Sequence, residues 1–294
     1  MFFFDPLRMV HERKNDSLSS QLSRLHFSEN ETGIIFIGNS LMDNALPLKE
    51  QDINKALSRE LQKQEKRNIS VSTFNAAMGD FSAWDLKSLK DEIMNSSPSV
   101  IVVQSEVIVA RYIKEPELQE RNLDRIGMWS GLLERRLLVG LPQSMQDQAK
   151  RGKLIGDKLI KQQIGKNLKV ELEKQQKELY LAITKSLWSG QNVSDTSADF
   201  LTSREFIQRA LSQGIRVIVL ELPVSRAIIS LAPEHYFTQR TAAIRSLSSR
   251  GRLVILRYPR VLPDEYFRDF RHLRPRGRRE FLEWFIPALA RELM

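Results

Sequence analysis

The sequence predicts an α/β fold built on a five-stranded parallel sheet of the doubly wound, flavodoxin-like type. Short β-branched apolar runs recur along the chain, and amphipathic helical stretches separate them. The run 100–103 is continuously apolar, which is typical of a strand covered by helices on both faces. We therefore expect three layers, with helices on both sides of the sheet.

Predicted strands and helices alternate from residue 34 to the end of the chain, with one interruption. The β-branched runs predict strands at 34–37, 69–74, 100–103, 215–220 and 253–256. Helical periodicity and stop signals predict helices at 48–63, 83–94, 200–212, 241–248 and 277–293.

The interruption spans residues 115–197, where the chain is rich in charge and its apolar residues follow a helical spacing. We interpret it as a helical insertion. Its segment 126–141 combines an apolar stripe with two arginines, and fits either a helix packed inside the insertion or a membrane-surface or partner helix. Residues 1–32 are polar and of mixed charge, so we expect an N-terminal arm before a main domain at 33–294.

The size, cysteine content and net charge of the chain exclude several classes of function. With 294 residues, 41% of them hydrophobic, the chain can bury one large core. It has no cysteine, which excludes disulfides, thiolate zinc sites and cysteine nucleophiles. The net charge of +9 favours anionic partners such as phospholipid headgroups or acidic polysaccharide. Nucleic acid is not expected, because no helix-turn-helix, zinc or RNP pattern accompanies the charge.

The start of the chain is apolar but short. The run Phe2-Phe3-Phe4 is followed by Asp5-Pro6, so it is too short for a signal sequence or a membrane span. We expect either a cytoplasmic protein or one whose anchor or signal lies outside this chain.

Two segments offer the groups of a serine nucleophile site. The first predicted strand ends in Gly38-Asn39-Ser40, at the edge where doubly wound sheets bind ligands. Asp269 and His272 are three residues apart and follow the last strand, so they can reach the same edge. A hydroxyl becomes a nucleophile when a base takes its proton and a third group orients that base. The alternatives are a helix-capping turn at Ser40 and an exposed ion pair at His272.

These segments resemble the sequence blocks of the SGNH, or GDSL-like, hydrolase superfamily. Gly38-Asn39-Ser40 matches its Gly-Asp-Ser block, and the segment 269–277 matches its Asp-x-x-His block with a glycine after a short turn. The segment from Phe74 to Gly79 is similar to the block that follows the second strand. The resemblance covers residue 33 to the C-terminus without the insertion.

The resemblance implies a role for each of these residues. Ser40 would be the nucleophile, His272 the base and Asp269 its orienting partner. Backbone N–H groups of Ser40 and Gly79 would bind the oxyanion, although Gly79 is also compatible with a turn that needs positive φ. The resemblance implies no metal and no organic cofactor.

The third block departs from the family pattern. Where the family has Gly-x-Asn-Asp, this chain reads Val103-Gln104-Ser105-Glu106. Gln104 offers an amide as a replacement oxyanion donor, whereas Glu106 would oppose a developing negative charge. Loss of one such donor typically lowers a rate by ~10²–10³. At the first block, Asn39 replaces the usual aspartate.

Arginines crowd the segment around His272, which suggests an anionic substrate or surface or, equally, a solvated basic helix start. They are Arg268, Arg271, Arg274, Arg276, Arg278 and Arg279. We take Asn39, Arg271 and Arg274 as candidate substrate-binding residues.

The predicted activity is that of an acylesterase of the carboxylic ester hydrolase class. Its expected partner is an acylated small molecule or polysaccharide. Family variants of this kind resemble proteins of bacterial envelope assembly, which favours an extracytoplasmic or membrane-associated location. The alternatives are an O-acyltransferase that uses the same triad, and a catalytically degenerate binding module.

Overall fold

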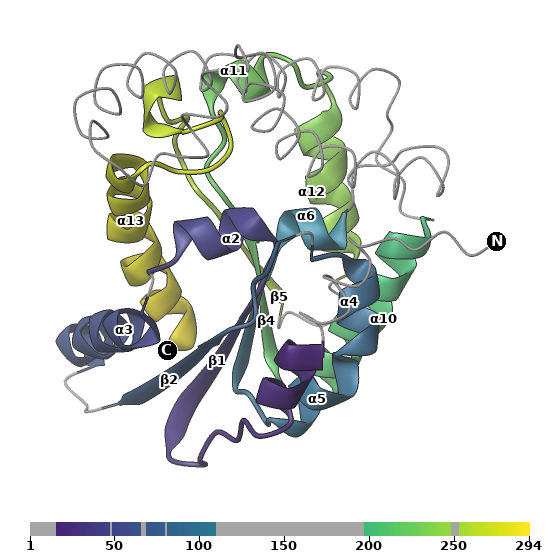
Figure 1. Ribbon diagram of the computed structural model, residues 1–294, viewed down its shortest axis with the longest axis vertical. Helices are drawn as coiled ribbons and strands as arrows, with labels where there is room; N and C mark the ends of the chain where they lie inside the picture. Colours follow the sequence, from purple (N-terminus) through teal and green to yellow (C-terminus); the bar gives the residue numbers. More distant parts are fainter. Residues whose placement is uncertain (1–15, 48, 66–68, 80, 110–196, 248–252) are drawn as a thin grey trace, which may run out of the picture. The chain divides into compact units, whose positions relative to one another are not determined.

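The computed structural model describes residues 16–47, 49–65, 69–79, 81–109, 197–247 and 253–294. At its centre is one sheet of five parallel strands in the order β2-β1-β3-β4-β5 (Figure 1). In chain order the strands are β1 (Glu31–Ile37), β2 (Ser70–Asn75), β3 (Val100–Gln104), β4 (Arg216–Glu221) and β5 (Leu253–Arg257). This order is the doubly wound, flavodoxin-like topology, and the predicted fold class is confirmed.

Helices cover both faces of this sheet. In chain order they are α2 (Ser40–Ala45), α3 (Glu50–Glu65), α4 (Ala83–Ser88), α5 (Lys90–Asn95), α6 (Ser105–Ile108), α10 (Ala198–Ser212), α11 (Arg226–Ile229), α12 (Tyr236–Ser246) and α13 (Pro275–Leu293), with a 3-10 turn η1 at Asp264–Tyr266. Figure 1 shows α3 and α13 on one side of the strands and α4, α10 and α12 on the other.

The strands separate two hydrophobic cores because successive side chains of a strand point to opposite faces. Ile34 and Phe36 of β1 join the core beneath α3 and α13, with Phe281 and Phe285 of α13. Ile35 and Ile37 join the core beneath α4, α5 and α10. Each fully buried side chain of this size contributes ~1.5–3 kcal/mol to folding. The double burial explains why β1 and β3 lack the polar alternation of a half-exposed strand.

Two predicted helices differ from the structure. The helix expected at 83–94 divides at Leu89 into α4 and α5. The Asp85 carbonyl accepts from both the Leu89 N–H at 2.9 Å and the Ser88 hydroxyl at 3.0 Å at this division. The helix expected at 241–248 begins earlier, at Tyr236, whose side chain is buried and contacts the ring of Phe237.

The N-terminal arm and the insertion are described only in part. Residues 16–22 are helical, and Leu18, Leu22 and Phe27 belong to one of the two cores, so this part of the arm packs on the sheet domain. The insertion predicted at 115–197 and its segment 126–141 lie outside the described residues, apart from Ser197. No helix in the described ranges is long and apolar enough to span a membrane.

Candidate active site

The site lies at the carboxyl end of β1, where the strand order reverses between β1 and β3. Ser40 is the first residue of α2, and the side chain of Asn39 caps this helix by accepting from the Leu41 N–H at 2.9 Å. Gly38 has no room for a side chain, because a Cβ there would lie 2.4 Å from Cβ of Met42. The segment is therefore a helix-capping turn that also presents Ser40 at the sheet edge.

The three residues of the predicted triad lie within hydrogen-bond distance of one another. Ser40 Oγ is 3.0 Å from Nε2 of His272, within the ~2.6–3.2 Å expected between a nucleophile and its base. His272 Nδ1 is 2.8 Å from Oδ2 of Asp269. The Asp269 and His272 side chains are 4% and 14% exposed, so little solvent competes for these hydrogen bonds.

A tight loop after η1 holds Asp269 and His272 in place. Asp269 Oδ1 accepts from the backbone N–H groups of Arg271 and His272 at 3.2 and 2.8 Å. The loop is closed below them by an antiparallel bridge between Phe267 and Leu273. The three-residue spacing thus belongs to a turn centred on Phe270, whose φ is 66°. A bulky residue in this region costs ~1–3 kcal/mol, which the surrounding hydrogen bonds must offset.

The ionised carboxylate of Asp269 determines which ring nitrogen of His272 carries the proton. Burial alone would raise the pKa of Asp269, but the hydrogen bonds and charge of His272 and the backbone N–H of Arg271 lower that pKa to about 2. Asp269 is therefore an ionised, acceptor-only carboxylate at neutral pH, and Nδ1 of His272 must carry the proton that faces it. In the neutral imidazole this leaves Nε2 free to accept the Ser40 hydroxyl proton.

The segment after β2 lies against the turn that carries Ser40. The Met78 N–H donates to the Gly38 carbonyl at 3.1 Å. Gly79 is the next residue after Met78, so it follows directly on a residue that is hydrogen-bonded to the Ser40 turn. Gly79 is not among the described residues with positive φ, so a left-handed turn does not explain the glycine. Its predicted role as a backbone oxyanion donor beside Ser40 stays a prediction.

Gln104 holds the turn that carries Ser40, and its predicted role as an oxyanion donor stays a prediction. Gln104 is fully buried, its Oε1 accepts from the Asn39 N–H at 2.9 Å and its Nε2 donates to Glu106 at 3.1 Å. Both ends of the amide are therefore engaged within the protein.

The negative charge of Glu106 is balanced by a buried arginine, Arg240. Its Oε1 lies 3.5 Å from Nη1 of Arg240 on α12, and the Arg240 side chain is 4% exposed. Arg240 also lies 3.6 Å from Glu221 at the end of β4. Burial lowers the pKa of Arg240, but the charges of Glu106, Tyr236 and Glu221 outweigh it and raise the pKa above its ordinary value. Sequence reasoning missed Arg240, whose only signal is a glutamate directly after the apolar run of β4.

The arginines around His272 have separate tasks. The Arg268 guanidinium lies 3.6 Å from Asp269, and Nε of Arg274 donates to the Phe267 carbonyl at 3.0 Å. The Arg276 guanidinium stacks 4.7 Å from the centre of the Tyr266 ring. The predicted substrate contacts of Arg271, Arg274 and Asn39 stay predictions. The Arg274 side chain is hydrogen-bonded to the backbone carbonyl of Phe267 in the loop of His272. The Asn39 side chain is hydrogen-bonded to the backbone N–H of Leu41 in the turn of Ser40.

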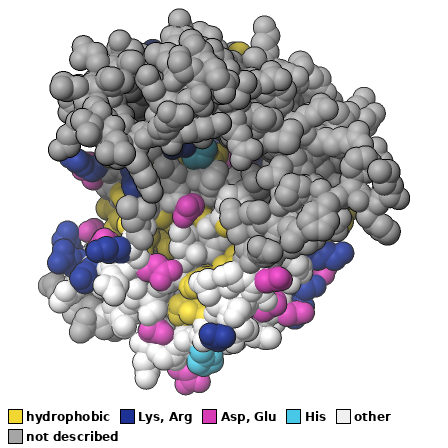
Figure 2. Space-filling model, viewed as in Figure 1, with side chains coloured by type: hydrophobic (Ala, Val, Ile, Leu, Met, Phe, Trp, Pro, Cys, Tyr) yellow, Lys and Arg dark blue, Asp and Glu magenta, His cyan; other side chains and the backbone are white. Residues whose placement is uncertain are grey.

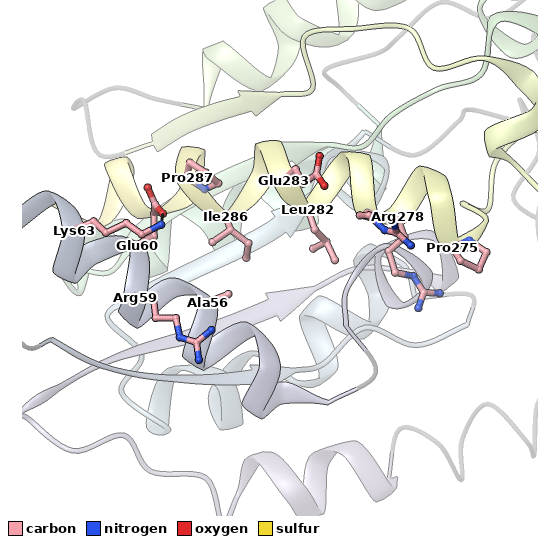
Figure 3. Close-up of a pocket in the computed structure, with 11 residues that line it drawn as sticks. Ala56, Arg59, Glu60, Lys63, Pro275, Arg278, Leu282, Glu283, Ile286 and Pro287 are labelled. Carbon is pink, nitrogen blue, oxygen red and sulfur yellow. Dashed lines mark hydrogen bonds and ion pairs between the residues drawn. The ribbon is translucent and has the colours of Figure 1, made fainter.

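A groove of about 540 Å³ runs between α3 and α13 (Figure 3). Its floor includes Leu282 and Ile286, and Arg59, Lys63 and Arg278 are among its charged lining residues. Figure 2 shows Lys and Arg side chains gathered on this side of the molecule, over α3 and α13. The groove begins at the start of α13, so part of the basic segment after His272 faces α3 rather than Ser40.

No protein-family model matches the sequence, and no curated protein matches it. The structure is similar to a lipase/acylhydrolase from Enterococcus faecalis at 13% identity and a TM-score of 0.43, over 89% of this chain and 94% of that one. It is also similar to the lipase Lip_vut3 from a goat rumen metagenome, at 13% identity and a TM-score of 0.38, over 89% and 95% of the chains. A third similar structure is TesA, at 10% identity and a TM-score of 0.40, over 88% and 99%. Function has to be argued from the residues of the site itself.

Proposed function

We propose that this protein is a serine-dependent ester hydrolase of the SGNH type, an acylesterase that works through Ser40, His272 and Asp269. The observation that carries the proposal is the unbroken series of contacts from the Ser40 hydroxyl to His272 at 3.0 Å and from His272 to Asp269 at 2.8 Å. The series lies at the switch point of a doubly wound sheet, where such folds bind their ligands.

With Asp269 ionised and Nε2 of a neutral His272 facing the Ser40 hydroxyl, the acylation step runs as a serine attack assisted by a general base. Ser40 Oγ attacks the acyl carbonyl carbon as its proton moves to Nε2 of His272, and the carbonyl oxygen takes up negative charge. Asp269 stabilises the imidazolium that forms. His272 then passes the proton to the departing alcohol oxygen as the carbon–oxygen bond breaks, which leaves an acyl group on Ser40.

Deacylation reverses these roles with water as the nucleophile. His272 takes a proton from water, the hydroxide oxygen bonds to the acyl carbon, and Ser40 leaves with the proton that His272 returns. The backbone N–H groups of Ser40 and Gly79 would bind the oxyanion in both steps. The bond from Met78 to Gly38 supports this pairing because it ties the two donor segments together.

Acylated carbohydrate of the cell envelope is the substrate class we propose. The support is the family resemblance together with basic side chains near the site, since Arg268 is exposed on the loop that carries His272 and Arg276 is exposed in the first turn of α13. The same acyl-enzyme would make an O-acyltransferase if a sugar hydroxyl replaced water. Product analysis with and without an added polysaccharide acceptor separates the two activities.

The test is labelling of the full chain with a fluorophosphonate, together with hydrolysis of a short-chain aryl ester. Ser40→Ala should abolish labelling, and His272→Ala should lower both labelling and hydrolysis by at least ~10³-fold. Ser58→Ala and His235→Ala remove a serine and a histidine outside the site and should change neither. A wild-type chain that is not labelled on Ser40, with hydrolysis unaffected in both site variants, would leave the degenerate binding module as the better account.

A further inference from the structure

A buried polar network connects the turn that carries Ser40 to the opposite side of β3. It runs from the Asn39 N–H to Gln104 Oε1 at 2.9 Å and from Gln104 Nε2 to Glu106 at 3.1 Å. Glu106 then pairs with Arg240, which bridges to Glu221 at 3.6 Å. Gln104, Arg240 and Glu221 are each at most 3% exposed. A buried network of this kind is stable only when its members are matched in charge and hydrogen bonding.

The charge of Glu106 gives the Gln104 amide a fixed direction. A carboxylate accepts hydrogen bonds but donates none, so the NH₂ end of Gln104 must face Glu106. The carbonyl end then has to face the Asn39 N–H. Arg240 lies 3.5 Å from Glu106 and supplies the opposite charge that a largely buried carboxylate requires.

The Asn39 N–H is close to the chemistry of the site. Its N–H belongs to the peptide between Gly38 and Asn39, and the next residue, Ser40, supplies both the proposed nucleophile and a proposed oxyanion N–H. Gln104 approaches so closely that a Cβ on Gly38 would lie 2.7 Å from Oε1. The glycine and the glutamine therefore fit together, and the pair fixes one side of the turn.

We propose that Gln104 is a positioning residue for the nucleophile, and that the Glu106–Arg240 pair sets the direction in which its amide points. In this proposal the segment Gln104-Ser105-Glu106, which departs from the family pattern, supports the turn that carries Ser40. It takes the place of a segment that would supply a side-chain oxyanion donor. Gln104 acts through the Asn39–Ser40 backbone and touches no reacting atom. This inference rests on the proposed hydrolase function for its catalytic consequence, but not for the contact itself.

The test is a cycle of nearly isosteric variants in the full chain: Q104E, E106Q and the double variant Q104E/E106Q. Q104E sets two carboxylates against each other, and E106Q removes the constraint on the amide direction. The double variant restores one carboxylate and one amide with the polarity reversed, so that position 104 still accepts from the Asn39 N–H. Q104A removes the acceptor altogether, and the exposed Gln51→Ala on α3 is the control.

Two readouts are needed, steady-state ester hydrolysis and NMR exchange of the Asn39 amide proton. We expect Q104A and Q104E to lower kcat by ~10–100-fold with KM changed less than ~3-fold, because the transition state depends most on the geometry of the turn. E106Q should have a smaller effect in the same direction. The double variant should recover kcat to within ~5-fold of wild type. Exchange at Asn39 should be faster in Q104A and near wild type in the double variant.

Unchanged exchange at Asn39 in Q104A would overturn the proposal whatever the activity does. A double variant no more active than Q104E would overturn the role of Glu106. Because Q104E and the double variant conserve volume, a Q104A chain that does not fold leaves the cycle intact, with melting temperatures as the check. If wild type hydrolyses no ester and Ser40 is not labelled, the proposed function fails, and amide exchange alone decides whether Gln104 holds the turn.

Discussion

The carboxylate of Asp269 should make the protein's stability depend on pH in acid. Its pKa falls from an ordinary 3.8 to about 2 in the folded state, and each tenfold change in proton affinity corresponds to ~1.4 kcal/mol. The folded state therefore gains ~2 kcal/mol from this ionised group. Because the pKa is lowered by folding, the gain is complete above pH ~5 and is lost as the pH falls toward 2, with ~1 kcal/mol gone by pH 3.

The comparison is urea unfolding of wild type and Asp269→Asn between pH 7 and pH 2.5. The asparagine cannot titrate, so the difference in unfolding free energy between the two proteins should shrink by 1 to 2 kcal/mol across this range. Glu265→Gln, which alters an exposed carboxylate four residues away, is the control and should give a difference that varies much less. A constant difference between wild type and Asp269→Asn would refute the reasoning, since Asp269 would then titrate alike in the folded and unfolded chains.

Two further substitutions test the packing behind the site. Arg240→Met removes the arginine 3.5 Å from Glu106 and one of the two arginines that pair with Glu221, the other being Arg257, and should lower the unfolding free energy by ~1–3 kcal/mol. The exposed Arg245→Met on the same helix should cost less than ~0.5 kcal/mol, and equal losses in denaturant titrations of the two variants would contradict the pairing. Gly38→Ala would set a Cβ 2.4 Å from the Met42 Cβ, which cannot swing away as a side-chain tip can. It should cost ~1–3 kcal/mol by thermal or urea unfolding and slow fluorophosphonate labelling, whereas wild-type values in both assays would show that the turn has more room.

The sheet and the proximity of Ser40, Asp269 and His272 were predictable because they depend on local patterns. The run Val100–Val103 is buried on both faces, so its composition alone marks a central strand. Ser40 and the Asp269–His272 pair follow the first and last strands, and the topology of a parallel sheet brings the carboxyl ends of its strands to one edge. No long-range contact has to be guessed to place these three residues together.

The hydrogen bonds and the ion pair that hold the Ser40 turn were not predictable, because they join segments that are distant in the sequence. Gln104 was predicted only as an oxyanion donor, and it is the structure that shows its amide between Asn39 and Glu106. The sequence offers no pattern that pairs Glu106 with Arg240, which is 134 residues away on another element.

The contact between Ser40 and His272 joins residues separated by 232 positions. Closing so long a loop has a large entropic cost until the strands between its ends are paired, so this contact should form late in folding. During synthesis, Ser40 is made long before His272 and stays without it until the segment that carries His272 has emerged. Under the proposed function, reaction of Ser40 with a fluorophosphonate would therefore report completed folding, and truncated chains that still carry the serine would not react.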